Sequence, residues 1–121
     1  MSRTDPRGKI LFVSDDVFFW ARVQGAARAL GREAVRIGDE AAMDAAFREG
    51  GVAQVIADLG SRSVDVAGWA VRWREAAAPP RLVAYGSHVD EAALAAARAA
   101  GYDEVMPNSR FNRELTRILQ S

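Results

Sequence analysis

The sequence has few or none of several residue types on which enzyme and metal chemistry commonly depends. Among its 121 residues there is no cysteine, one histidine and one lysine, Lys9. The absence of cysteine excludes disulfides, thiol nucleophiles and thiolate metal ligands, and it fits a reducing compartment. Because His88 is the single histidine, a zinc site built from histidine and cysteine is excluded as well.

The sequence also lacks an excess of one charge and a long apolar run. Sixteen basic residues balance sixteen acidic ones, so no long-range field favours nucleic acid or an anionic membrane over other partners. The segment 1–8 is polar, and the apolar run that starts at Ile10 is far too short for a signal peptide or a membrane span. We therefore expect a cytoplasmic protein that binds neither nucleic acid nor membrane directly.

The length and composition indicate one folded domain. Half of the residues are apolar, which is enough for a single hydrophobic core, while 121 residues are too few for such a domain and a separate output domain. We expect a short polar tail over residues 1–8 and one domain over residues 9–121.

Strand and helix patterns alternate five times along this domain. The continuous apolar run 10–13 is typical of a parallel strand buried on both faces, whereas Val17, Trp20 and Val23 recur at helical spacing. Strands are predicted over 10–13, 34–37, 52–57, 82–85 and 104–106, and helices over 16–30, between Asp39 and Gly50, over 66–77, from a Ser87 capping box to Gly101, and after a Ser109 cap. This order predicts an α/β fold with a doubly wound, five-stranded parallel sheet between two helical layers.

Polar residues follow the predicted strands where the functional cleft of such a sheet lies. In doubly wound folds that cleft is outside the carboxyl ends of the strands. The residues at those ends are Ser14, Asp15, Asp16, Asp58, Gly86, Ser87 and Asn108.

The run I-L-F-V precedes Ser14, V-I-A-D ends at Asp58, and A-A-G-Y-D-E follows helix four. Together, these positions and runs resemble the CheY-like receiver domains of bacterial response regulators, which have a flavodoxin-like fold. The resemblance implies two-component signal transduction, with Asp58 as the phosphoacceptor. It also implies a Mg²⁺ site, for which Asp15 matches one acid of the family's pair and Asp16 and Asp58 are the further carboxylate candidates.

Several positions depart from the pattern of the receiver family, so the chain resembles an atypical receiver. Ser14 stands in place of the first acid, the switch hydroxyl falls on Gly86 with Ser87 one residue late, and the lysine falls on Asn108. Lys9 precedes Asp15 by six residues, and at ~3.3 Å per strand residue it lies too far away to replace that lysine. Whether Arg110 or Arg62, in loops expected to border Asp58, replaces it is left open.

The resemblance further implies a docking face near strands four and five, where Tyr85 and Phe111 lie. A histidine kinase or a downstream signalling protein would be the partner, and a homodimer is left open. Because Phe18, Phe19 and Trp20 are consecutive, they cannot all point inward, and Phe18 or Phe19 is expected either to cover the cleft or to contact a partner.

We predict a receiver that signals through protein–protein interaction and does not depend on normal aspartyl phosphorylation. The alternative is a working phosphorelay receiver that uses Asp58, Mg²⁺ and substituted switch residues.

An enzyme is not expected. Ser87, His88 and Asp90 are residue types of nucleophilic triads, but neighbours in sequence rarely face each other, and Ser87 and Asp90 are better explained as helix caps.

Overall fold

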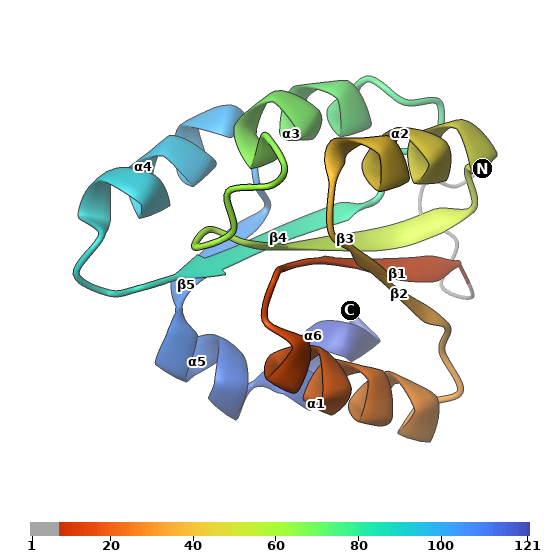
Figure 1. The fold of residues 1–121 in the computed structure, drawn as a ribbon, viewed down its shortest axis with the longest axis horizontal. Helices are drawn as coiled ribbons and strands as arrows, with labels where there is room; N and C mark the ends of the chain where they lie inside the picture. Colours follow the sequence, from red (N-terminus) through yellow and green to blue (C-terminus); the bar gives the residue numbers. More distant parts are fainter. Residues whose placement is uncertain (1–7) are drawn as a thin grey trace.

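The computed structural model describes residues 8–121, and its centre is a sheet of five parallel strands in the order β2-β1-β3-β4-β5. This order and the alternation with helices confirm the predicted doubly wound fold (Figure 1). Of the predicted polar tail, residues 1–7 lie outside the described part of the chain. The strands are β1 (Lys9–Val13), β2 (Ala34–Ile37), β3 (Val52–Asp58), β4 (Arg81–Gly86) and β5 (Glu104–Pro107).

Helices cover both faces of the sheet, as Figure 1 shows. One layer contains α2 (Glu40–Glu49), α3 (Val66–Arg74) and α4 (Glu91–Ala100). The other contains α1 (Val17–Ala29), α5 (Asn108–Arg113) and α6 (Leu115–Gln120). Within residues 8–121, no helix is both long and apolar enough to cross a membrane.

Strand β1 explains why the core has two halves. Its residues 10–13 are buried because both faces of the sheet are covered, and successive side chains point to opposite faces. Leu11 and Val13 pack in the cluster beneath α2, α3 and α4, whereas Ile10 and Phe12 pack in the cluster beneath α1, α5 and α6. The parallel register, with Val13 opposite Ala57 in β3, brings the carboxyl ends of the strands to one edge of the sheet.

Aspartate N-caps fix the starts of four helices. The side chains of Asp16, Asp39, Asp65 and Asp90 each accept a hydrogen bond from a backbone amide in the first turn of α1, α2, α3 and α4. The predicted capping box at Ser87 is therefore wrong, because Asp90 itself caps α4. A short oxygen-bearing side chain at this position satisfies amides that lack a partner within the helix.

The C-terminal region differs from the single helix predicted after a Ser109 cap. Strand β5 continues through Pro107, whose extended backbone leads directly into α5, so Ser109 lies inside the helix and does not cap it. The helical backbone is then interrupted at Glu114, which separates α5 from α6. Helix α3 is also shorter than predicted and ends at Arg74, because the amides of residues 75 and 76 bond three residues back and tighten the last turn.

Candidate functional site

The candidate site lies at the carboxyl edge of the sheet, where the predicted cleft residues gather. Asp58 ends β3 and Gly86 ends β4, while Ser14 follows β1 and Asn108 begins α5 directly after β5. The placement of these strand ends side by side was predicted correctly, because the parallel register requires it. The directions of the side chains were not all as expected.

Asp58 is held by two hydrogen bonds from neutral donors. The Ser14 hydroxyl donates to Asp58 Oδ2 at 2.7 Å, and the Gly60 amide donates to Asp58 Oδ1 at 2.8 Å. Ser14 is fully buried, and its Oγ also accepts a hydrogen bond from the Asp16 amide at 3.0 Å. Ser14, which stands in place of the family's first acid, is thus a structural partner of Asp58 and donates its hydroxyl proton to the Asp58 carboxylate.

The carboxylates of Asp15 and Asp16 each accept hydrogen bonds from other partners. Asp15 accepts hydrogen bonds from the hydroxyls of Ser61 at 3.2 Å and Ser63 at 3.1 Å, in the loop after β3. Asp16 Oδ1 caps α1 by accepting from the amides of residues 18 and 19. Both acids therefore stabilise the backbone around the cleft.

The predicted Mg²⁺ site is not formed by these three carboxylates. Within residues 8–121, no three side chains of histidine, cysteine, aspartate or glutamate are grouped so that they could hold a metal ion. Mg²⁺ favours a compact octahedral set of oxygen ligands. A serine beside Asp58 donates its proton to that carboxylate, so the three acids are not assembled as a ready-made ligand set, and Mg²⁺ binding stays a prediction.

The switch positions lack a hydroxyl that could follow Asp58. Gly86 is buried, and a Cβ atom at this position would lie 3.1 Å from Leu59 Cβ, so Leu59 occupies the space of a larger side chain. Ser87 is exposed, and its Oγ accepts a hydrogen bond from the Val89 amide at 3.4 Å. The assignment of Ser87 as a substitute switch residue stays a prediction.

Lys9 and Arg110 both form ion pairs with glutamates, so neither takes the place of the missing lysine beside Asp58. Lys9 pairs with Glu49 at 2.8 Å, away from the cleft as predicted. Arg110 was expected to border Asp58, but its Nε bonds Glu114 at 3.2 Å, because the two residues are one turn apart on a helical stretch. Arg62 is exposed, and the structure gives it no contact with Asp58.

Tyr85 and Phe111 do not form an exposed docking face. Both side chains are buried, and their rings stack with centroids 4.1 Å apart. Phe19 packs edge-on against both rings and Trp20 stacks on Phe12, so these two members of the aromatic run point inward, whereas Phe18 is 86% exposed. Tyr85 is on β4 and Phe111 is on α5, as predicted. Both are buried in the hydrophobic core beneath α1 and α5, so they are not available as an exposed docking face.

The Tyr85 hydroxyl is a buried polar group at the centre of the site. It has no hydrogen-bond partner among the described residues. Burial in the first place, and then the charge of Asp58, raise the pKa of the Tyr85 phenol, so it stays protonated at neutral pH. Tyr85 therefore offers a hydrogen-bond donor to the cleft.

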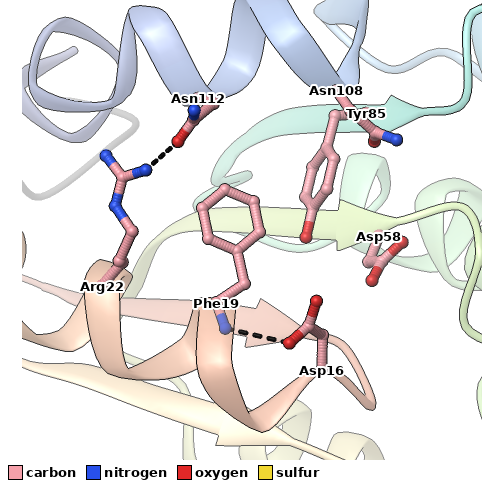
Figure 2. A pocket seen from close by; sticks show the side chains of 7 residues that line it. All are labelled: Asp16, Phe19, Arg22, Asp58, Tyr85, Asn108 and Asn112. Atoms are coloured by element: carbon pink, nitrogen blue, oxygen red, sulfur yellow. Dashed lines mark hydrogen bonds between the residues drawn. The ribbon is translucent and has the colours of Figure 1, made fainter.

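A pocket of about 510 Å³ opens between α1 and α5 beside Asp58. Figure 2 shows Arg22 and Asn112 at one end of the pocket, Asp16 and Asp58 at the other, and the Phe19 ring between them. The Arg22 guanidinium donates to Asn112 Oδ1 and lies 5.7 Å from the centre of the Phe19 ring. The lining residues are Asp16, Phe19, Arg22, Asp58, Tyr85, Asn108 and Asn112.

Sequence reasoning missed Arg22 and Asn112. The spacing of residues 16, 19 and 22 places them on neighbouring parts of one helix face, and this spacing was the available signal for Arg22. Asn112 lies four residues after Asn108 and so follows it on α5. A pocket between two helices that are distant in sequence depends on how those helices pack, which periodicity alone does not give.

Comparisons with known proteins place the fold in one class. No protein-family model matches the sequence, and no curated protein sequence matches it either. Solved structures do match, and they show that the chain has the fold of response-regulator receiver domains.

Three of these structures illustrate the likeness. A response-regulator receiver domain from Bermanella marisrubri has a TM-score of 0.76 and 21% identity, over 91% of this chain and 93% of that one. Full-length FixJ from B. japonicum has a TM-score of 0.78 and 17% identity, over 94% of this chain and 56% of FixJ. The receiver domain of a sensor histidine kinase from Pseudomonas aeruginosa, with magnesium coordinated in its active site cleft, has a TM-score of 0.76 and 18% identity, over 93% and 94% of the two chains.

Proposed function

We propose that this chain is a receiver-like, non-enzymatic domain of two-component signalling that acts through protein–protein interaction and does not depend on aspartyl phosphorylation. The fold supports the signalling class. The observation that supports independence from phosphorylation most strongly is the 2.7 Å hydrogen bond from the buried Ser14 hydroxyl to Asp58 Oδ2. This neutral donor satisfies one oxygen of Asp58 but brings no positive charge to the site.

The charges around Asp58 disfavour a phosphoryl group on its carboxylate. Phosphorylation adds a charge of about −1.5 to −2 at neutral pH, which needs cations or a metal ion nearby. Asn108 is neutral, and the Arg22 guanidinium is engaged by Asn112 at the far end of the pocket. Asp16 lines the same pocket and adds negative charge.

The start of α1 supports a protein partner. Val17 is 56% exposed and Phe18 is 86% exposed, and they adjoin the cleft through Asp16 and Asp15. A large aromatic side chain in water gains free energy when a partner covers it, and aromatic residues often dominate binding energies. We propose that these two residues contact the partner, in place of Tyr85 and Phe111, which are buried.

The test separates phosphorylation from binding. Incubation with acetyl phosphate and phosphoramidate, followed by intact-protein mass spectrometry, should give no acid-labile phosphate on Asp58. Incorporation that is lost in Asp58→Asn would replace our proposal with the working phosphorelay receiver.

Partner binding gives the complementary test. A partner, whether a kinase, a downstream protein or a second copy of the chain, should bind wild type and Asp58→Asn with equal affinity. Phe18→Ser should weaken binding by about tenfold or more. A large loss in Asp58→Asn with none in Phe18→Ser would contradict both parts of the proposal.

A further inference from the structure

We propose that the pocket between α1 and α5 binds a small amphoteric molecule, with an amine near Asp16 and Asp58 and a carboxylate near Arg22. The class of ligand is an amino acid whose two charged groups are separated by a short apolar chain. This inference does not rest on the protein interaction proposed above, because it concerns the interior of the pocket, whereas Phe18 is on the outer surface.

The Tyr85 hydroxyl is a buried polar group that a ligand in this pocket could bond. Tyr85 is only 2% exposed, and its hydroxyl has no hydrogen-bond partner among residues 8–121. Figure 2 shows the hydroxyl directed into the space beside Asp16 and Asp58. An unpaired buried polar group costs about 1–3 kcal/mol, and a polar ligand atom would remove this cost.

The charges of the pocket are separated in space. Asp16, the N-cap of α1, precedes Arg22 by six residues, which corresponds to a rise of about 9 Å along the helix axis. Asp16 uses Oδ1 to cap the helix, which leaves Oδ2 facing the pocket, and Asp58 lies beside it (Figure 2). The negative end of the pocket is therefore distinct from the positive end at Arg22.

This arrangement selects a ligand with both charges. A simple anion such as phosphate would gain from Arg22 but would be repelled by the two carboxylates, and a simple amine would meet the opposite problem. Phe19 lies between the charged ends in Figure 2 and provides an apolar surface for methylene groups. Asn112, which lies beside Arg22, adds an amide group that can bond a carboxylate.

The test is an amide NMR titration of the full chain with 4-aminobutyrate, 5-aminopentanoate and 6-aminohexanoate. Hexanoate, hexylamine and inorganic phosphate are the comparison probes, since each carries one kind of charge. At least one amino acid should give saturable shifts at the amides of Phe19, Arg22, Tyr85 and Asn112. The probes with one charge should bind about tenfold more weakly or worse.

Variants then assign the two ends of the pocket. Arg22→Gln and Asp16→Asn should each weaken amino acid binding by about tenfold, and asparagine preserves the helix cap. Arg28→Gln, an exposed position on the same helix, is the matched control and should leave affinity unchanged. Tyr85→Phe retains the ring and should weaken binding severalfold through loss of the hydroxyl.

Three outcomes would overturn the inference. The first is the absence of saturable shifts with all three amino acids at millimolar concentrations while the protein remains folded. The second is equal affinity for hexanoate, hexylamine or phosphate. The third is equal affinity of wild type and Arg22→Gln for the best amino acid.

Discussion

Replacing Gly86 with alanine tests whether the switch position is sterically closed. The added Cβ would lie 3.1 Å from Leu59 Cβ and 3.4 Å from Leu59 Cδ1, whereas carbon atoms in ordinary contact are about 3.5–4.0 Å apart. Rotation of the leucine side chain moves Cδ1 but leaves Cβ in place. The Leu59 amide also donates to the Tyr85 carbonyl at 2.8 Å, which restrains the backbone from moving away.

The expected cost follows from these distances. Overpacking of a buried position typically destabilises a protein by about 1–3 kcal/mol. Alanine also restricts the unfolded chain relative to glycine, which returns about 0.4–1 kcal/mol. We therefore expect Gly86→Ala to lower the free energy of unfolding by about 1 kcal/mol or more.

A double-mutant cycle measured by urea unfolding identifies the obstructing atom. Leu59→Gly removes the Cβ contact, so the cost of Gly86→Ala should largely disappear in that background, with a coupling energy of about 1 kcal/mol. Leu59→Ala keeps Cβ and should relieve much less. The control is Gly25→Ala inside α1, where nothing lies within 4 Å of the added atom, and it should stabilise the protein by about 0.5–1 kcal/mol.

The steric explanation fails if Gly86→Ala is as stable as wild type, or if its cost is the same in the wild-type and Leu59→Gly backgrounds. Either result would mean that the position could accept a hydroxyl-bearing residue without resistance from Leu59.

Three further changes test other parts of the structure by urea unfolding. Ser14→Ala should cost about 1–3 kcal/mol, because it leaves Asp58 Oδ2 without its donor, and an unchanged stability would refute that bond. Phe111→Ala should cost about 3–5 kcal/mol if the ring is core, whereas a surface role predicts less than about 0.5 kcal/mol. Hydrogen bonding to Arg117 lowers the pKa of Glu104, so its charge stabilises the fold above the unfolded pKa of about 4.3 and this contribution is lost as pH falls through the folded pKa. Glu104→Gln should therefore cost about 1 kcal/mol at pH 7 and less as the pH falls below the unfolded pKa, and a cost that does not change with pH would contradict the ion pair.

The fold was predictable because local patterns and topology agreed. The apolar run at 10–13 could only be a buried central strand, and glycines and aspartates marked the helix ends. The positions of Asp58 and Asn108 at one sheet edge then followed from parallel pairing. The break at Glu114 was not predictable, since Phe111 and Leu115 keep a helical spacing across it.

The site was only partly predictable because side-chain direction depends on local hydrogen bonds. Asp15 and Asp16 were identified as cleft acids, but the serine hydroxyls of the loop after β3 bond Asp15, and the first turn of α1 bonds one oxygen of Asp16. Arg110 pairs within its own helical stretch, and Arg22 lines the pocket instead. These outcomes depend on which donors and acceptors lie nearest in three dimensions.

The most direct measurement of the central proposal is an amide NMR titration with Mg²⁺ followed by beryllofluoride, a mimic of an aspartyl phosphoryl group, with Asp58→Asn as the control. We predict no shifts on addition of beryllofluoride beyond those that the control also shows. The reason is that the Ser14 hydroxyl is hydrogen-bonded to Asp58 and that a neutral residue, Asn108, stands in place of a cation. Shifts that begin at Asp58, spread to Tyr85 and Phe111, and vanish in Asp58→Asn would contradict the proposal and show a working phosphorylation switch.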